Sequence, residues 1–198
     1  MNSTLVIGRS GEGKTTFVKE KFIYPDKPCL AFDINNEFYE DRRPQALQIK
    51  DKKLREIINP RLPVIKYEVK NDRPVFDRKM TRARYIGGDM EEFLNIAVTK
   101  RNCNIIIDES TMFFDGKITA KKLTEIIVLR KHRFTNIVLN FHAIGDVPPA
   151  LYRKAEFIVL FKTDDTINDI PNKGKFLEKY FLKLKEMPDH SKFIIPRT

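Results

Sequence analysis

The stretch Gly8-Arg9-Ser10-Gly11-Glu12-Gly13-Lys14-Thr15 has the form G-x-x-x-x-G-K-[ST], which is the pattern of a phosphate-binding loop. An apolar run, Thr4–Ile7, precedes the loop and predicts a buried strand, and the residues after it, Thr16–Phe22, have helical spacing. A strand, a loop and a helix in this order form the context in which the motif binds phosphate. The stretch therefore predicts an α/β nucleotide-binding fold.

Each part of the loop has a physical role in binding a triphosphate. The glycines let backbone N–H groups converge on phosphate oxygens, and the start of the helix adds partial positive charge. Lys14 is expected to reach the β- and γ-phosphates, and the Thr15 hydroxyl to bind Mg²⁺. Glu12, an acid beside the expected phosphates, is expected to point to solvent. ATP and Mg²⁺ are thus the predicted ligands, held by consecutive residues: Gly8, Arg9, Ser10, Gly11, Glu12, Gly13, Lys14, Thr15 and Thr16.

The length and composition favour one domain. A chain of 198 residues that is 41% hydrophobic can bury one sizeable core, so we expect a single domain over residues 1–198. Residues 40–88 are expected to form a less regular insertion, and residues 174–196 to add a helix and an edge strand. No apolar window is long enough to span a membrane, and the first strand leaves no room for a signal peptide. The two cysteines, Cys29 and Cys103, lie beside predicted strands and are expected to be reduced core thiols in a cytoplasm.

A formal net charge of +10 indicates a second class of ligand. It favours an anionic polymer as partner, because a nucleotide alone does not require so large an excess of cations. The alternative is a basic protein without such a partner. One basic run fits either a nucleic-acid contact or a solvated surface loop; its members are Arg73, Arg78, Lys79, Arg82 and Arg84.

Apolar strand patterns alternate with helical patterns along the rest of the chain. Strands are predicted at Cys29–Phe32, Asn104–Ile107, Ile137–His142, Phe157–Phe161 and Phe193–Ile195. Helices are predicted at Asp89–Lys100, Ala120–Lys131, Pro148–Lys154 and Gly174–Met187. A short helix over Lys52–Ile58 and an extended segment over Val64–Val69 complete the pattern. This alternation predicts an α/β, three-layer P-loop NTPase fold (RecA/ASCE-like) with a mostly parallel central sheet.

Polar residues follow several of these strands, at the edge of the sheet where ligands bind. Asp33 follows one strand, and Asp108 and Glu109 follow another. Asp108 is expected to position Mg²⁺ together with the loop, and Glu109 to orient the water that attacks the γ-phosphate. Asn140 and His142 end a further strand, and either can sense the γ-phosphate; His142 can equally be a structural histidine. A water-activating carboxylate favours hydrolysis over transfer to a small acceptor.

Arg130 and Arg133 come just before the strand that ends at His142. In the usual sheet order neither arginine reaches its own nucleotide easily. Both suit the site of a neighbouring subunit, where a guanidinium stabilises transition-state charge. A surface arginine is the alternative in each case, and the sequence does not distinguish Arg130 from Arg133.

These segments together resemble the FtsK–HerA group of P-loop motor ATPases. The resemblance covers residues 1–34 and 104–163, and it rests on the phosphate loop, on Ile105-Ile106-Ile107-Asp108-Glu109 and on the later strand with a polar tip. Asp33–Tyr39 is similar to the group's Asp-x-x-Gly-Glu-Tyr stretch, and Val147–Leu151 to the segment before its final core strand. Two departures are that Asn140-Phe141-His142 replaces the usual sensor glutamine, and that Asn136 replaces the glycine after the arginine.

Within this group, the small size and the missing membrane span are most like the genome-packaging ATPases of membrane-containing icosahedral viruses. The resemblance implies an ATPase that translocates double-stranded DNA through a homo-hexameric ring. Met112–Lys122 would then face the pore, with Lys117, Lys121 and Lys122 on DNA phosphates. It also implies capsid or membrane-vertex proteins as partners, and a place in the host cytoplasm or in association with the virion.

Three other classes of protein use the same loop. A small-molecule or nucleotide kinase needs a lid with arginines, which the run from Arg73 to Arg84 would have to supply, and Glu109 argues against it because it would promote wasteful hydrolysis. A GTPase switch is disfavoured because Asn172–Lys175 lacks the aspartate that reads guanine. A phage assembly ATPase similar to the zonular-occludens-toxin-like proteins usually carries a membrane span, and the sequence predicts none.

Overall fold

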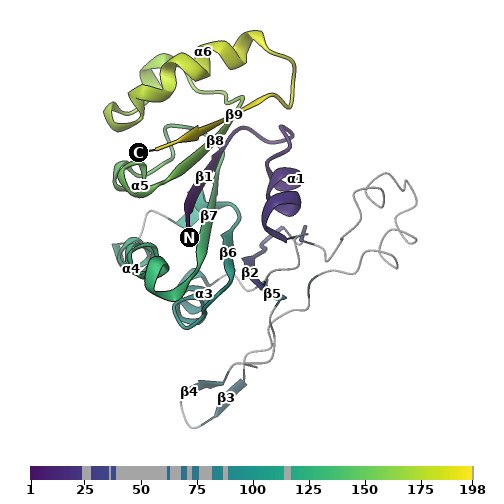
Figure 1. The fold of residues 1–198 in the computed structure, drawn as a ribbon, viewed down its shortest axis with the longest axis vertical. Helices are drawn as coiled ribbons and strands as arrows, with labels where there is room; N and C mark the ends of the chain where they lie inside the picture. The colour runs from purple at the N-terminus through teal and green to yellow at the C-terminus, as the bar shows by residue number, and fades with distance from the viewer. Residues whose placement is uncertain are drawn as a thin grey trace, which may run out of the picture.

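A seven-stranded sheet in the order β5-β2-β6-β7-β1-β8-β9 forms the centre of the molecule (Figure 1). All strands but β9 are parallel, and β9 runs antiparallel to β8 at one edge. The strands of the sheet are β1 (Ser3–Ile7), β2 (Cys29–Phe32), β5 (Arg82–Tyr85), β6 (Asn104–Ile107), β7 (Asn136–Phe141), β8 (Phe157–Phe161) and β9 (Lys192–Pro196). The predicted α/β class and parallel sheet are confirmed, and so is the C-terminal edge strand.

The structure is a computed structural model, and it describes part of the chain. The described residues are 1–23, 28–35, 37–38, 62, 68–70, 73–75, 82–86, 89–113 and 117–197, with the backbone alone at 68–70, 73–75, 112–113 and 117–120. Two short strands, β3 (Glu68–Lys70) and β4 (Arg73–Val75), form a separate antiparallel hairpin. The predicted helix over Lys52–Ile58 lies outside the described residues, as do most of the Val64–Val69 segment and most of the predicted insertion at 40–88.

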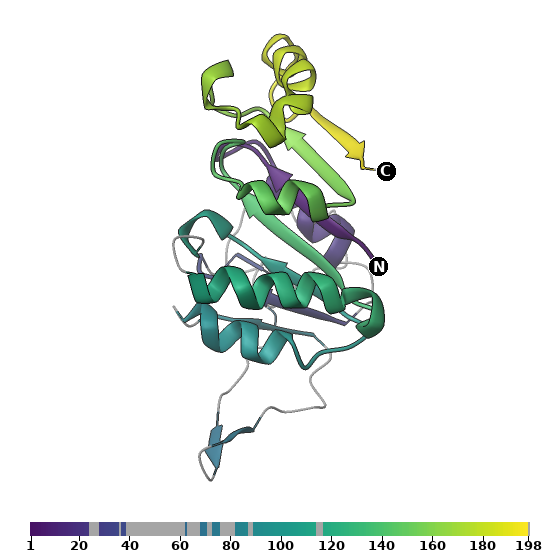
Figure 2. The same cartoon turned by 90° about the vertical axis from the view of Figure 1, so that its left-hand side faces the viewer.

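Helices cover both faces of the sheet, as the three-layer prediction requires (Figures 1 and 2). One face carries α1 (Lys14–Val18), which continues as a π-helical turn at Lys19–Ile23. The other face carries α3 (Met90–Ala97), α4 (Lys117–Arg133), α5 (Pro149–Lys154) and, beside β8 and β9, α6 (Glu178–Glu186). Short 3-10 turns occur at Ser110–Phe113, Ile167–Asp169 and Asn172–Leu177. Among the described residues, no helix combines the length and the apolar character that crossing a membrane requires.

Alternate side chains of the central strands enter two separate cores. In β1, Leu5 and Ile7 pack into the larger core beneath α3, α4 and α6, whereas Val6 packs into the smaller core with α1. This alternation explains why each strand is a nearly continuous apolar run, because both faces of a parallel sheet are covered. Cys29 and Cys103 are both buried, and burial raises the pKa of the Cys103 thiol to about 12.

Strand β5 was not predicted, because its two arginines placed it in the basic run from Arg73 to Arg84. The structure buries all of these residues, including both arginines. Arg82 donates to the carbonyl oxygen of Ile23, and Arg84 donates to that of Leu62 at 2.7 Å. The interpretation of these two arginines as part of a basic surface run is therefore wrong. Their guanidinium groups stabilise the fold by satisfying buried backbone carbonyls.

Asp33, at the end of β2, anchors the turn that follows this strand. Its carboxylate is fully buried and accepts hydrogen bonds from the backbone N–H groups of Glu37 at 2.7 Å and Phe38 at 3.1 Å. The guanidinium of Arg84 lies 3.2 Å away and supplies the compensating charge. The carboxylate is thus fully engaged in holding β2, β5 and the turn together.

The buried ion pair gives a first prediction. Arg84→Met should lower the free energy of unfolding by about 3 kcal/mol or more, because the carboxylate of Asp33 stays buried without its cation. Urea denaturation followed by circular dichroism measures the change. The double variant Arg84→Met/Asp33→Asn should recover part of the loss. Arg101→Met, at an exposed cation, is the control, and equal destabilisation by Arg84→Met and Arg101→Met would contradict this role.

Candidate nucleotide site

The strand register brings the expected site residues to one edge of the sheet. β7 lies between β1 and β6, with Ile7 paired to Phe141 and Ile107 paired to Leu139. One residue further on, Asp108 is level with Asn140. The first residue of the phosphate loop follows Ile7 directly, and its N–H donates to the carbonyl oxygen of Phe141 at 3.1 Å. The phosphate loop, the two acids and the polar end of β7 therefore meet where three parallel strands end.

The loop needs glycine at three positions for two different reasons. Gly11 and Gly13 have φ angles of 83° and 91°, in the left-handed region that side chains disfavour. Gly8 packs against β8, where a Cβ atom would lie 2.6 Å from the Cβ of Phe161. The next residue, Arg9, donates its N–H to the carbonyl oxygen of Lys162 at 2.8 Å. The loop is thus tied to β7 on one side and to β8 on the other.

Lys14 lies buried beneath the loop, at the start of α1. Its ammonium donates to the carbonyl oxygens of Gly8 and, at 2.9 Å, of Arg9. Desolvation lowers the pKa of Lys14, and the nearby charges of Glu109 and Asp108 oppose this shift. The ammonium group of Lys14 is therefore enclosed by the loop and lies near the two acids.

Asp108 is the buried carboxylate of the site. Asn140 donates its amide N–H to Asp108 at 2.7 Å, and the amide oxygen of Asn140 is buried without a partner. Burial raises the pKa of Asp108 to about 6. A buried carboxylate with a raised pKa is suited to binding a cation, and the half-buried Thr15 supplies a hydroxyl on the first turn of α1.

These two side chains are the residues that would hold Mg²⁺. Mg²⁺ in nucleotide sites takes one or two protein ligands and completes its shell with phosphate oxygens and water. The described part of the chain contains no group of three histidine, cysteine, aspartate or glutamate side chains that could hold a metal ion. The donor set of Thr15 and Asp108 fits the ion.

Glu109 has an unusual backbone and two side-chain partners. Its φ angle of 52° lies in the left-handed region, at a cost of about 1–2 kcal/mol for a residue with a Cβ atom. Its carboxylate bonds to Nε2 of His142 and accepts from Nδ2 of Asn35 at 3.4 Å. The carboxylate of Glu109 therefore lies between the end of β7 and the turn after β2. Asn35 lies in the Asp33–Tyr39 stretch that carries part of the family resemblance, but nothing in its residue type or spacing assigned it a role.

The expectation that Glu12 points to solvent is wrong. Its carboxylate is buried and accepts from Nε of Arg9 and from the backbone N–H of His190, both at 2.9 Å. The reason is tertiary, because the turn between α6 and β9 packs against the loop. Its Asp189 accepts from Lys162 at 2.9 Å. The acid thus joins the C-terminal turn to the phosphate loop.

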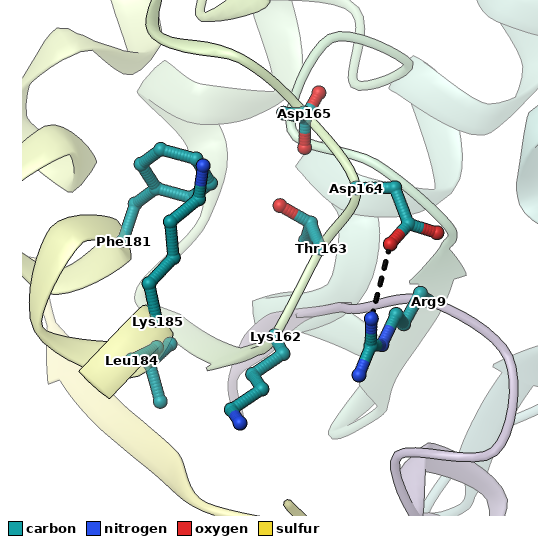
Figure 3. A pocket seen from close by; sticks show the side chains of 8 residues that line it. All are labelled: Arg9, Lys162, Thr163, Asp164, Asp165, Phe181, Leu184 and Lys185. Carbon is teal, nitrogen blue, oxygen red and sulfur yellow. Dashed lines mark hydrogen bonds and ion pairs between the residues drawn. The ribbon is translucent and has the colours of Figure 1, made fainter. Parts of the chain in front are cut away.

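A cavity of about 320 Å³ lies between the loop and α6 (Figure 3). Arg9 reaches its rim and pairs with Asp164 at 3.2 Å. The residues that line this cavity are Arg9, Lys162, Thr163, Asp164, Asp165, Phe181, Leu184 and Lys185. A second hollow, of about 260 Å³, lies between the loop and the end of β7 and is lined by Arg9, Ser10, His142, Ala143 and Asp164. The phosphate loop therefore borders open space on its α6 side and at the end of β7.

The structure does not bring the two arginines to the loop. They lie near the C-terminal end of α4, which leads into the start of β7, whereas the loop lies level with the end of β7. Arg130 pairs with Glu156 at 3.0 Å. The guanidinium of Arg133 has no ion pair or hydrogen bond among the described residues. Of the two, Arg133 is thus the one that can reach another molecule without breaking an internal pair.

The three lysines expected on DNA lie on α4, also apart from the loop. Lys121 is exposed, and Lys122 donates to Glu91 and, at 3.0 Å, to Asn95 on α3. The side chain of Lys117 lies outside the described part of the chain. Lys122 can reach a phosphate only by giving up its contacts with α3.

The loop, the strand order and the paired acids define a P-loop NTPase fold of the RecA/ASCE type. Comparison with solved structures agrees, and the matches include the genome packaging NTPase B204 from Sulfolobus turreted icosahedral virus 2. In complex with AMP, that protein has a TM-score of 0.61 and 18% identity over 98% of this chain and 92% of its own. In complex with ATP-gammaS, the values are 0.62 and 18% over 98% and 91%.

B204, the DNA-packaging ATPase from Sulfolobus turreted icosahedral virus, matches with a TM-score of 0.59 and 17% identity over 100% of this chain and 98% of its own. No protein-family model matches the sequence, and no curated protein matches it. At these identities the likeness shows the fold. The resemblance to viral genome-packaging ATPases that the sequence predicted is confirmed as a structural match over nearly the whole chain.

The buried acid gives a second prediction. The pKa of Asp108 is about 6 in the folded chain against an ordinary 3.8, so above pH 6 its ionisation lowers the free energy of unfolding by about 3 kcal/mol. Asp108→Asn should therefore be more stable than the parent at pH 8 without nucleotide. The gain should shrink as the pH falls from 6 to 4, where the parent's carboxyl is protonated when folded. Denaturant titrations at these pH values measure it, and a gain that does not change with pH would contradict the assignment.

Proposed function

We propose that this chain is a Mg²⁺-dependent ATPase that works as a motor on double-stranded DNA. One observation carries the proposal: the phosphate loop with Lys14, the carboxylate of Asp108 and the carboxylate of Glu109 converge at the ends of β1 and β6, on either side of β7. The first two parts bind a triphosphate, and the third can activate water. No other cluster in the described part of the chain combines these three features.

Phosphate binding starts from the loop. Residues Gly8 to Thr16 would surround the β- and γ-phosphates with backbone N–H groups and the start of α1. The ammonium of Lys14 would leave the carbonyl oxygens of Gly8 and Arg9 and bind phosphate oxygens in their place. Mg²⁺, held by Thr15 and Asp108, would neutralise phosphate charge. Asn140 keeps Asp108 in position for this through its 2.7 Å hydrogen bond.

Water activation would fall to Glu109. Its carboxylate is partly exposed and already accepts hydrogen bonds, so it can accept one from the attacking water and polarise it. His142 would set the orientation of this carboxylate, and Asn35 would support it from the turn after β2. The buried amide oxygen of Asn140 is an acceptor, so it would reach the γ-phosphate through a bridging water that donates to both. We therefore assign His142 to positioning Glu109, and Asn140 to positioning Asp108 and sensing the γ-phosphate.

The proposal of a DNA partner and of a ring rests on the net charge and on the fold. The chain carries a formal net charge of +10, and its fold matches that of a DNA-packaging ATPase. In a ring, Arg133 would act on the nucleotide of the next subunit. Lys121, with Lys117 and Lys122, would contact DNA phosphates from the pore. Packaging of a viral genome, with capsid or membrane-vertex proteins as partners and the host cytoplasm or the virion as the place of action, is the role that this fold favours.

A kinase is a weaker alternative. Such an enzyme needs arginines on a lid over the phosphates, and the basic run from Arg73 to Arg84 was the candidate in the sequence. Arg82 and Arg84 are buried in β5 and bound to backbone carbonyls, so these two cannot serve. Glu109 beside the expected phosphates further favours water as the acceptor.

The third prediction separates binding from hydrolysis. Glu109→Gln should retain ATP binding and lose turnover by about 100-fold or more, because it removes the water-polarising charge and little else. Lys14→Ala should lose tight nucleotide binding. Equilibrium binding of a fluorescent ATP analogue and steady-state phosphate release measure the two effects. Glu125→Gln, at an exposed carboxylate on α4, is the matched control and should behave like the parent; an equally active Glu109→Gln would remove Glu109 from the reaction.

The fourth prediction tests the arginine in trans. Arg133→Ala should be inactive alone, and mixing it with Lys14→Ala should restore part of the ATPase activity, because a hybrid ring joins an intact loop to an intact arginine. Phosphate release across mixing ratios measures the recovery, with subunit mixing checked by native mass spectrometry. Arg130→Ala is the comparison, and it should mainly lower stability by removing the less exposed of the two cations that pair with Glu156. Confirmed hybrid rings with no recovery at any ratio would show that Arg133 is a surface residue.

A further inference from the structure

The edge of the sheet opposite the phosphate loop carries an unusual excess of positive charge. Because the strands are parallel, the segments that lead into β6, β7 and β8 all meet at this edge, and antiparallel β9 ends there. Residues 98–103, 130–135, 152–156 and 196–197 make up these segments. They contain eight lysines and arginines and a single acid, Glu156. The excess is therefore created by the topology, since no one stretch of sequence shows it.

A groove of about 410 Å³ lies in the middle of this edge, between α4, the end of α5 and the start of β8. We call it the basic groove, and its lining residues are Ile127, Val128, Arg130, Arg153, Lys154, Ala155, Glu156 and Arg197. Four of these residues are cationic. Val128 is apolar and 57% exposed, so the groove also offers a surface on which a sugar can pack.

The cations of the basic groove are not neutralised by acids among the residues that the structure describes. Glu156 accepts from Arg130 at 3.0 Å and lies 3.6 Å from Lys131, so its one charge is already shared between two partners. Arg153 and Lys154 form no ion pair among the described residues. The groove thus keeps a net positive charge in a concave site, which concentrates the field on an incoming anion.

Two guanidinium groups in the groove also have unused hydrogen-bond donors. Nε of Arg130 and a terminal nitrogen of Arg197 are buried and have no acceptor among the described residues. The guanidinium of Arg197 stacks over the ring of Phe176 at 3.9 Å, which restricts its movement. An unsatisfied buried donor is costly. A phosphate group carries several acceptor oxygens and binds arginine in a bidentate geometry.

We propose that the basic groove is a binding site for the phosphate backbone of a nucleic acid, distinct from the nucleotide site and from the lysines of α4. The inference rests on the proposed function, because it extends the DNA partner to a second surface. Arg153 and Lys154 contact consecutive phosphates, and Arg130 and Arg197 hold the walls of the groove in place. A contact made to phosphates carries no sequence information, so we expect binding at the groove to be independent of the DNA sequence.

The test compares two double variants that lose the same charge. Arg153→Ala/Lys154→Ala removes the two unpaired cations of the groove, and Lys175→Ala/Lys183→Ala removes two exposed cations from the α6 region. Fluorescence anisotropy with a labelled mixed-sequence duplex measures affinity over a range of salt concentrations. The groove variant should bind more weakly and lower the slope of log affinity against log salt by about 2 per engaged subunit. The control should keep the parent's slope, and both variants should keep the parent's ATPase rate without DNA.

Other outcomes overturn the inference in distinguishable ways. If the parent binds duplex and the groove variant has the same slope, the groove does not bind nucleic acid and the proposed function stands. If the parent does not bind duplex at any salt concentration, both fail. If inorganic phosphate binds to Lys14→Ala, and adding the groove substitutions removes that binding while duplex affinity stays the same, the groove is a site for a free anion. If the groove variant changes only the particle mass in sedimentation, the groove is a contact between copies of the chain.

Discussion

The hydrogen-bonded register of β1, β7 and β6 is the constraint on which the rest of the site depends. β7 lies between the strand that leads into the phosphate loop and the strand that leads into Asp108 and Glu109. A shift of one residue would turn Asn140 away from Asp108, because successive side chains of a strand point to opposite faces. The bond from the N–H of Gly8 to Phe141 continues the same register into the loop. The apolar side chains on both faces of these strands hold it, since each face is covered by helices.

Given this register, the site keeps charges in places that are unfavourable for stability. Lys14 is buried with its pKa lowered by desolvation, and the pKa of the nearby Asp108 is raised to about 6 by burial. Glu109 has a left-handed backbone, and the amide oxygen of Asn140 is buried without a hydrogen-bond donor among the described residues. Such features are common at functional sites, where a ligand later supplies the missing interactions. A triphosphate with its cation would supply them here, since it offers anionic oxygens to Lys14 and positive charge to Asp108.

The sequence was sufficient for the parts of the fold that depend on local pattern. The phosphate loop, the apolar strands and the acids at their ends follow from periodicity and motif, and so does the short helix at Pro149. The sequence was insufficient where tertiary contacts determine whether a charged side chain is buried or exposed. The sequence of Arg82–Tyr85 is typical of a basic surface segment. In the structure, however, its arginines are buried and bind Asp33 and two backbone carbonyl oxygens. Glu12 was expected to be exposed, but the turn at His190 packs against it. The basic groove is formed by segments that are separate in the sequence and meet at one edge of the sheet.

The central claim is that ATP binds in the loop and is attacked by a water that Glu109 holds. A crystal or electron microscopy structure of the chain with ATPγS and Mg²⁺ tests it most directly. The account predicts that Lys14 leaves the carbonyl oxygens of Gly8 and Arg9 for the β- and γ-phosphates, with the carboxylate of Glu109 facing the γ-phosphate through a water. A nucleotide bound elsewhere, or a bound triphosphate with Lys14 still on those carbonyls, would contradict it.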